Sequence, residues 1–312
     1  MRAAVVGLGT QGRKRVRVAA SDVVATVDPT VEDATFRELE QIPLGDYDSA
    51  LVCTPDDSKL ALLRFLLANG KNVLVEKPLL LTQEESAELN ALARQSGVVA
   101  YTAYNHRFEP HLMRVRDILA SQSLGKISMV SMYYGNGTAR DVRNSPWRDR
   151  GLGVIADLGS HMLDLVDYWF PAGESSSDLN PELQWAQQFE NLSYDAFSMS
   201  LVRVPTFVQI EGSLLSWRNT FRLDVIGEDG SVHVDGLCKW GPSILRVRER
   251  VLPSGRPNEQ EFVLEQPDPT WEAEYEHFRS ICRSGDGGGF QSDVAVSKAL
   301  RQVERQLSDR AS

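Results

Sequence analysis

The chain has 312 residues, of which 42% are hydrophobic and 24% charged, a composition typical of a globular protein. Its length is about twice that of a common single domain, which predicts two domains. The 33 Lys and Arg residues against 43 Asp and Glu residues give a formal charge of −10, which argues against nucleic acid or an acidic membrane surface as a partner. The cysteines Cys53, Cys238 and Cys282 are widely spaced. We therefore expect a cytoplasmic protein without a disulfide framework or a bound metal.

The first hundred residues alternate short apolar runs with helical patterns, which is typical of βαβ units. Strands are expected at 3–6, 23–27, 49–53, 72–75 and 98–103, and helices at 13–20, 60–69 and 83–95. This order predicts an α/β protein whose N-terminal part is a Rossmann domain with a doubly wound parallel sheet.

The segment Gly7-Leu8-Gly9-Thr10-Gln11-Gly12 matches GxGxxG and lies between the first strand and the first helix. Such glycines allow a tight turn and close approach of a pyrophosphate to the helix N-terminus. Asp28 ends the next strand, where a carboxylate accepts hydrogen bonds from a ribose 2′-hydroxyl, so NAD is favoured as the cofactor. The cations at 13–15 leave NADP open if they face a phosphate, but we expect them to form a solvated first helical turn.

After about residue 120 the pattern changes to short strands joined by turns. This change predicts a C-terminal α+β domain with a large, mostly antiparallel open sheet. The expected strands are 126–134, 196–204, 206–215, 220–226, 231–234, 243–251 and 261–264. A helix is expected at about 154–170 and two more near the end of the chain. We therefore predict a dinucleotide-binding domain over 1–119 and a substrate-binding and oligomerisation domain over 120–312, with the C-terminal helix able to pack back on the first domain.

The predicted helix at 154–170 carries a histidine between two carboxylates. Asp157, His161 and Asp164 are spaced by four and three residues, so they share one helical face. A histidine suits a general base, and a carboxylate one turn away can orient its ring. A hydrogen-bonded structural histidine and an Asp/His metal site are the alternatives, although the metal site lacks further ligands at a recognisable spacing.

Read together, the motifs resemble the GFO/IDH/MocA family of oxidoreductases over nearly the whole chain. The matching segments are Gly7 to Gly12, Cys53-Thr54-Pro55, 70–78, 104–108, Trp147-Arg148 and 153–164. The resemblance implies an NAD(P)-dependent dehydrogenase or reductase that transfers a hydride between the nicotinamide and a hydroxyl or keto carbon of a sugar, polyol or nucleotide-linked sugar.

The resemblance also implies roles for individual residues. Lys77, Asp157 and His161 fall on the catalytic positions: His161 takes the hydroxyl proton, Lys77 donates a hydrogen bond to the developing oxyanion, and Asp157 holds the imidazole. Cofactor-binding positions are the glycine segment, Asp28, Thr54, Pro55, Glu76, Lys77, Trp147 and Arg148. Asn105 and Arg107 are implied to line the substrate cleft.

The donor-rich segment 133–144 is predicted to be a loop that faces the substrate. We expect Asn136, Arg140 and Arg143, with Asp164, to bind substrate, and the arginines suit an anionic group such as a nucleotide diphosphate.

The sequence departs from the family pattern in three regions. The glycine triplet that the family has before the catalytic helix is present only as Gly151-Leu152-Gly153. Asp56 and Lys59 stand where Asn and His are usual after Thr54-Pro55. Only 24 residues separate Asp28 from Cys53, so a strand or helix is expected to be shortened or absent there.

Two other functions fit the same fold. The first is a non-catalytic, dinucleotide-sensing regulatory protein. The second keeps the dinucleotide for other chemistry, such as reduction of a linear tetrapyrrole or sugar oxidoreduction with an enclosed cofactor. The resemblance further implies a homo-oligomer, a dimer or tetramer, formed through the exposed face of the C-terminal sheet.

Overall fold

The computed structural model describes residues 1–171, 178–203, 205–285 and 289–311. The chain divides into two compact units. The first comprises Met1–Asn105 and Thr270–Ser297, and the second comprises His106–Pro269 and Lys298–Ser312. In the described part of the chain, no helix combines the length and the apolar character needed to cross a membrane.

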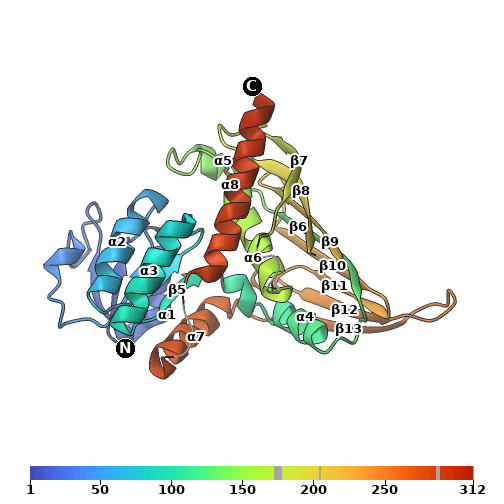
Figure 1. Ribbon diagram of the computed structural model, residues 1–312, viewed down its shortest axis with the longest axis horizontal. Helices are drawn as coiled ribbons and strands as arrows, with labels where there is room; N and C mark the ends of the chain where they lie inside the picture. The colour runs from blue at the N-terminus through green and yellow to red at the C-terminus, as the bar shows by residue number, and fades with distance from the viewer. Residues whose placement is uncertain (172–177, 204, 286–288, 312) are drawn as a thin grey trace. The chain divides into compact units, whose positions relative to one another are not determined.

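The first unit is built on a five-stranded parallel sheet with the order β2-β1-β3-β4-β5. Figure 1 labels strand β5 and the helices of this unit. Its strands are β1 (Ala3–Val6), β2 (Val23–Val27), β3 (Ser49–Val52), β4 (Asn72–Glu76) and β5 (Ala100–Ala103). The helices of this unit are α1 (Thr10–Ala19), α2 (Asp56–Ala68), α3 (Gln83–Ser96) and α7 (Thr270–Ser284). All four strand pairings are parallel, so the carboxyl ends of the strands lie along one edge of the sheet. The predicted parallel Rossmann sheet is confirmed.

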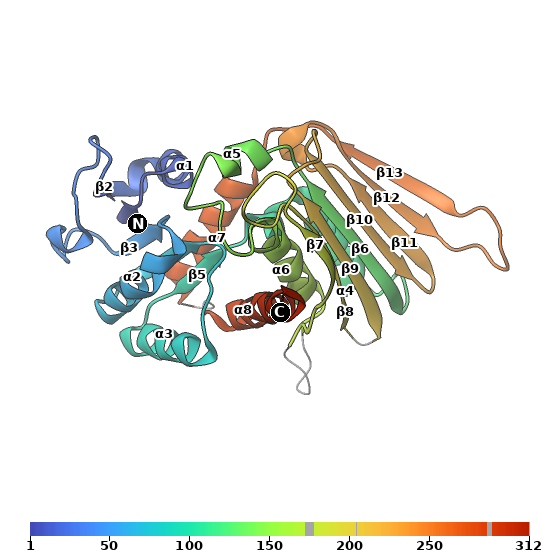
Figure 2. The same ribbon diagram turned by 90° about the horizontal axis from the view of Figure 1, so that it is seen from above.

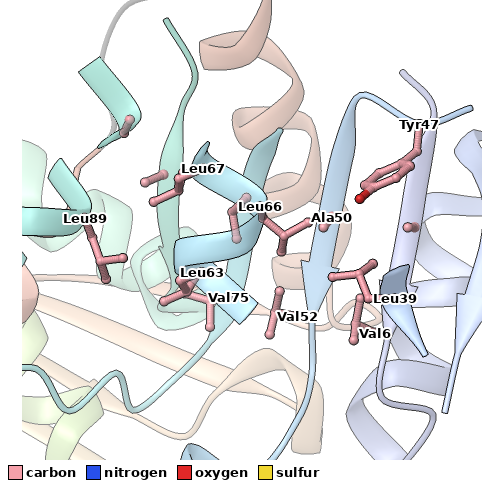
Figure 3. Packing of buried hydrophobic residues seen from close by; sticks show 14 of the residues in the cluster. Val6, Leu39, Tyr47, Ala50, Val52, Leu63, Leu66, Leu67, Val75 and Leu89 are labelled. Atoms are coloured by element: carbon pink, nitrogen blue, oxygen red, sulfur yellow. The ribbon is translucent and has the colours of Figure 1, made fainter. Parts of the chain in front are cut away.

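Helix α2 supplies much of the apolar core of this unit (Figure 3). Leu63, Leu66 and Leu67 are fully buried at the i, i+3, i+4 spacing of one helical face. They pack with Val52 and Val75 from the central strands. Burial on both faces explains why β1 and β3 read as continuous apolar runs in the sequence.

The connection between β2 and β3 lacks a full crossover helix. Its only described elements are a 3₁₀ helix, η2 (Leu39–Gln41), and a single bridge between Val27 and Phe36. Ile42 and Tyr47 are buried in the core beneath this connection. The shortening expected between Asp28 and Cys53 is therefore present, and apolar side chains of the connection fill the space.

The second unit is built on an eight-stranded sheet with the order β13-β12-β11-β10-β6-β9-β8-β7. The strands are β6 (Ile127–Gly135), β7 (Glu182–Gln187), β8 (Ala196–Arg203), β9 (Thr206–Ser213), β10 (Thr220–Gly227), β11 (Gly230–Asp235), β12 (Ser243–Glu249) and β13 (Asn258–Leu264). Only the β6–β9 pairing is parallel, which confirms a mostly antiparallel sheet. Val204, the last residue of one predicted strand, lies outside the described residues.

Helices lie on one face of this sheet (Figure 2). A π-helical turn, η4 (Ile155–Gly159), runs into α6 (Ser160–Trp169), and η4 packs on β6 and β9. The helix α4 (Pro110–Ala120) packs on β11 and β12. The end of α8 (Gln291–Ala311) runs beside β7. The Gln306 side-chain amide donates a hydrogen bond to the Pro181 carbonyl oxygen, just before β7 begins.

The compact units differ from the predicted division at 119/120. Helix α4 belongs to the second unit because it packs on that unit's sheet. Helix α7 returns to the first unit because it packs on α1. The C-terminal helix was expected to pack back on the first domain; this helix, α8, divides between the two units after Ser297. Neither α4 nor β7 was predicted. Strand β7 gave little signal because only Leu183 in it is fully buried.

Candidate active site

The predicted cofactor residues of the first unit lie at or just after the carboxyl ends of its parallel strands. Gly7 follows β1, Asp28 follows β2, Thr54 follows β3 and Lys77 follows β4. Strand β1 lies between β2 and β3, so the chain reverses its direction of winding at β1. Open α/β sheets bind ligands at this kind of switch point.

The three glycines of the GxGxxG segment have different roles. Gly7 has a φ of +90°, and a Cβ there would lie 2.7 Å from the Cys53 carbonyl oxygen. A Cβ on Gly12 would lie 1.8 Å from the Gly7 carbonyl oxygen, so α1 can approach the loop this closely only without a side chain. Gly9, by contrast, would meet nothing within 4 Å. The backbone at Gly9 is therefore open to a ligand.

Helix α1 begins in a manner suited to an anion. Its N-cap is Gly9, no side chain caps it, and its first turn contains no acidic residue. The backbone N–H groups at Thr10, Gln11 and Gly12 have no intrahelical acceptor, and the helix dipole favours negative charge at this end. This cradle fits the pyrophosphate of a dinucleotide.

Asp28 connects the glycine loop to the end of β2. Its carboxylate accepts hydrogen bonds from the backbone N–H of Leu8 at 2.8 Å, of Thr30 at 2.9 Å and of Val31 at 3.1 Å. Burial opposes the charged form, but these hydrogen bonds together hold the pKa of Asp28 below its ordinary value. A carboxylate group that remains ionised at neutral pH thus stands at the predicted ribose position.

The cations after the glycine loop are not a uniformly solvated turn, so that expectation was wrong for Arg15. Arg13 is exposed and pairs with Asp33 at 3.1 Å. Arg15 is buried, because its guanidinium binds Glu76 at 2.7 Å and Glu274 at 2.6 Å. Neither arginine is left uncompensated to attract a phosphate. Lys14 lies over the ring of Trp271, with Nζ 3.9 Å from the ring centroid.

The segment around Lys77 is held from both sides. Glu76 is buried, and its carboxylate accepts the hydrogen bond from Arg15 Nε. Lys59, on the first turn of α2, is also buried and donates from Nζ to the carbonyl oxygens of Glu76 at 2.7 Å and Pro78 at 2.8 Å. Its third acceptor is Asp56, at 2.7 Å. The two departures from the family pattern, Asp56 and Lys59, therefore bind each other.

Thr54 and Pro55 lie directly before α2, for which Pro55 is the N-cap residue. Asn105 follows β5 and donates from its side-chain amide to Thr270 Oγ1 at 2.8 Å. Its amide therefore helps to attach the start of α7 within the first unit.

In the second unit, Asp157 and His161 lie on one continuous helical segment. Asp157 is in the π turn η4, and His161 is in the first turn of α6. A π turn contains one more residue than an α turn, so the straight α-helix predicted over 154–170 was wrong at Asp157. The chain before it depends on Gly153, where a Cβ would lie 2.3 Å from the Tyr194 carbonyl oxygen. Asp157 and His161 still lie on one helical segment, but the angle between them about the helix axis differs from that in a regular α-helix.

His161 belongs to a group of four rings and one lysine that the sequence did not reveal, which we call the His161 cluster. Its buried members are His106, Tyr134 and His161, and its partly exposed members are Lys239 and Trp240. The ring centroids of His106 and His161 are 3.9 Å apart. The ring centroid of Tyr134 lies 5.4 Å from that of His106 and 5.6 Å from that of Trp240. These residues come from 3₁₀ turns, a strand and a helix that are far apart in the chain, so no spacing rule could have grouped them.

Lys239 gives this cluster a cation. Its Nζ donates to the Tyr134 hydroxyl at 3.1 Å and lies 4.6 Å from the centroid of the Trp240 ring. Burial lowers the pKa of Lys239 to about 8, while the carboxylates of Asp268, Glu109 and Asp157 oppose this shift. Asp157 is thus coupled to the cluster electrostatically.

The predicted substrate arginines are engaged with carboxylates. Arg107 binds Asp164 through both Nε, at 2.8 Å, and Nη2, and only 1% of the Asp164 side chain is exposed. Burial raises the pKa of Asp164, although Arg107 favours its ionised form. Both carboxylate oxygens of Asp164 accept hydrogen bonds from Arg107, so in this structure the two predicted substrate residues bind each other.

The segment 133–144 is not simply a loop. It comprises the end of β6 and a short helix, α5 (Ala139–Arg143). Asn136 Oδ1 accepts hydrogen bonds from both the backbone and the hydroxyl of Thr138, so its amide oxygen shapes this turn. The Arg140 side chain is highly exposed, and its Nε lies 3.7 Å from Glu190 Oε2. Arg143 is also exposed, and its positive charge favours the ionised form of Asp149.

Trp147 and Arg148 lie beyond α5. The Trp147 side chain is 60% exposed, and Arg148 Nη2 lies 3.9 Å from the Asp157 carboxylate. Within the second unit, the predicted cofactor residue Arg148 therefore lies near the predicted catalytic residue Asp157. Within the described ranges, no three His, Cys, Asp or Glu side chains are grouped so that they could hold a metal ion.

A glycine cradle on a parallel sheet, with a buried histidine and a carboxylate on an α+β unit, is the arrangement of a dinucleotide-dependent oxidoreductase. Comparison with known families agrees. An oxidoreductase family with an NAD-binding Rossmann fold, GFO/IDH/MocA, matches residues 1–104, and the GFO/IDH/MocA C-terminal domain matches residues 112–233. The chain belongs to the GFO/IDH/MocA oxidoreductase family, and its first unit is an NAD-binding Rossmann domain.

Individual relatives extend over most of the chain. It is 28% identical over 319 residues to the uncharacterized oxidoreductase YdgJ of Escherichia coli, covering 95% of this chain and 88% of that protein. It is 31% identical over 276 residues to trans-1,2-dihydrobenzene-1,2-diol dehydrogenase of Sus scrofa, covering 86% and 78% respectively. A solved structure of levoglucosan dehydrogenase with NADH shares the fold, with a TM-score of 0.80, 16% identity and coverage of 98% and 97%.

Proposed function

We propose that this oxidoreductase transfers a hydride between NAD and a hydroxyl or keto carbon of a sugar, polyol or nucleotide-linked sugar. The observation that carries the proposal is that one chain contains both an open glycine cradle at a helix N-terminus and a buried histidine on the same helical segment as the carboxylate of Asp157. A regulatory protein that only senses the dinucleotide would need the cradle alone. The similarity to a diol dehydrogenase supports a substrate with hydroxyl-bearing carbons.

The proposed mechanism assigns a separate role to each of three side chains, His161, Lys77 and Asp157. Bound NAD supplies the nicotinamide carbon that accepts or returns the hydride. In the oxidative direction, His161 takes the proton from the reacting hydroxyl group, and Lys77 donates a hydrogen bond to the oxygen as negative charge develops on it. Asp157 stabilises the imidazolium that results. In the reductive direction the same groups return the proton.

The proposal favours NAD over NADP. The ionised carboxylate of Asp28 would repel a 2′-phosphate, whereas it can accept hydrogen bonds from a ribose hydroxyl group. The cations that could offset this repulsion are engaged: Arg13 pairs with Asp33, and Arg37 donates to the Val31 carbonyl oxygen. The pairing of Arg107 with Asp164 likewise weakens the argument for an anionic substrate.

We propose further that the protein is a cytoplasmic homo-oligomer that assembles through the open face of the eight-stranded sheet. The three cysteines are unpaired, which is usual in a reducing compartment. On the sheet, Met129, Phe207 and Val202 are partly exposed and lie side by side in register on β6, β9 and β8. A contiguous apolar strip of this kind favours a protein partner.

The test begins with calorimetry of the purified protein with NADH and NADPH, followed by a panel of sugars, polyols and nucleotide sugars monitored by NAD(P)H absorbance. We expect tighter binding of NADH and turnover with at least one substrate. The variants Lys77→Ala and His161→Asn should lower turnover by about 10²–10⁴-fold with little change in NADH affinity. Absence of cofactor binding would refute the proposal at its first step, and binding without turnover on any panel member would favour the sensing function.

A further inference from the structure

Lys59 is a buried lysine whose three ammonium protons all have acceptors. Only 3% of its surface is exposed. Nζ lies 2.7 Å from Asp56 Oδ1, 2.7 Å from the Glu76 carbonyl oxygen and 2.8 Å from the Pro78 carbonyl oxygen. An ammonium group has three N–H donors and no acceptor, so this set satisfies it completely. Such a buried charge is costly unless it is fully bonded.

The two backbone acceptors lie immediately before and after one residue, Lys77. Holding the carbonyl groups of Glu76 and Pro78 on the same ammonium fixes the Glu76–Lys77 and Pro78–Leu79 peptide units relative to α2, and Lys77 lies between them. The Glu76 side chain is fixed separately by Arg15 at 2.7 Å. The backbone from which the Lys77 side chain departs is therefore attached to α1 by an ion pair and to α2 by Lys59.

A second buried lysine in the same unit shows what this bonding pattern does without a functional neighbour. Lys71 is 7% exposed and donates from Nζ to the carbonyl oxygens of Leu44 at 2.5 Å and Tyr47 at 2.8 Å. These acceptors belong to the connection between β2 and β3, which contains no predicted catalytic residue. Lys59 and Lys71 are thus matched in burial and in carbonyl bonding, and they differ in what they hold.

We propose that Lys59 is a positioning residue for Lys77, with Asp56 as its counterion. It orients the backbone on both sides of Lys77 so that the Lys77 ammonium meets the reacting oxygen. The inference rests on the proposed function, in which Lys77 donates to that oxygen. A small displacement of a catalytic group lowers the rate of the chemical step, so the effect of losing Lys59 should fall on kcat.

The experiment compares Lys59→Met, the matched control Lys71→Met, the conservative variant Lys59→Arg and the reference variant Lys77→Ala. Each is measured for kcat and KM with NAD and the substrate found in the panel, for NADH affinity by calorimetry, and for Tm. We expect Lys59→Met to lower kcat by about 10–100-fold, with KM and NADH affinity within about 3-fold of wild type. Lys71→Met should lose a similar amount of Tm but keep kcat within about 2-fold. Lys59→Arg should recover part of kcat, because a guanidinium can still donate to both carbonyl oxygens.

The inference is overturned if Lys59→Met and Lys71→Met have the same kcat while Lys77→Ala is strongly impaired. Wild-type turnover in Lys77→Ala would instead refute the proposed function itself, so the two failures are distinguishable. If Lys59→Met does not fold, Lys59→Gln takes its place, since its amide retains two donors. An unchanged kcat in Lys59→Gln and Lys59→Arg together would then overturn the inference.

Discussion

Cations near the cofactor cradle and the cation of the His161 cluster are stabilised differently. In the first unit, Arg15 meets the carboxylates of Glu76 and Glu274, and Lys59 meets one carboxylate and two carbonyl oxygens. In the second unit, Lys239 meets a neutral phenol and the face of an indole ring. The cofactor unit thus keeps its buried charges fixed by anionic and carbonyl acceptors, whereas the His161 cluster holds a cation whose charge responds to pH.

The pKa directions express the same difference. Burial alone would lower the pKa of Arg15, but Glu274 and Glu76 raise it well above its ordinary value. Burial dominates at Lys239, whose pKa falls to about 8. A rigid cradle for a dinucleotide benefits from charges that do not titrate, and a proton-transfer region can use groups that do.

The largest effect on stability should come from Arg15→Met. Removing this guanidinium leaves Glu76 and Glu274 buried without their partner, so we expect the free energy of unfolding to fall by about 3–5 kcal/mol. The matched control is Arg13→Met, two residues away, whose pair with Asp33 is exposed and should contribute less than about 1 kcal/mol. Urea denaturation of both variants measures the difference. Equal losses would show that the Arg15 ion pairs do not hold the cofactor unit together.

The substitution Gly12→Ala should have the next largest effect. Its Cβ would lie 1.8 Å from the Gly7 carbonyl oxygen, so α1 must shift away from the loop. We expect the free energy of unfolding to fall by about 1–3 kcal/mol and NADH binding to weaken. Gly9→Ala is the control, because a Cβ there meets nothing within 4 Å of the protein. We expect Gly9→Ala to keep its Tm and to lose only NADH affinity, as measured by calorimetry. Loss of Tm in Gly9→Ala would contradict the separate roles of the two glycines.

The smallest effect is the pH dependence contributed by Lys239. Its pKa of about 8 lies below its ordinary value of 10.5, so between these pH values the unfolded chain holds more protons than the folded chain. The contribution of Lys239 to the free energy of unfolding should therefore increase as the pH rises from about 8 to 10.5, and decrease again as the pH is lowered to 8. Comparing wild type with Lys239→Met across that window isolates a contribution on the order of 1 kcal/mol. A flat difference would mean that Lys239 titrates normally and that the two units do not differ in this respect.

Local patterns predicted the cofactor unit closely. The strand at 3–6, the glycine turn and the strand at 23–27 were found where expected, because each depends on neighbouring residues and because β1 is buried on both faces. The catalytic histidine candidate was also found from its helical neighbours. In contrast, β7 was missed because its side chains are mostly exposed, and the π turn at Asp157 was missed because it requires contact between Gly153 and Tyr194.

The parallel Rossmann unit, the mostly antiparallel second sheet, the glycine cradle and the family resemblance could all be predicted from the amino-acid sequence, since they rest on periodicity and on motifs within short segments. The tertiary structure was needed to establish which charges are engaged. It buried Arg15 between two carboxylates, paired Asp164 with Arg107, grouped His106 and Lys239 around His161, and seated Lys59 on the carbonyl groups beside Lys77. The physical reason is that an ion pair or a ring contact depends on distance in space, and residues up to 259 positions apart in the chain make these contacts.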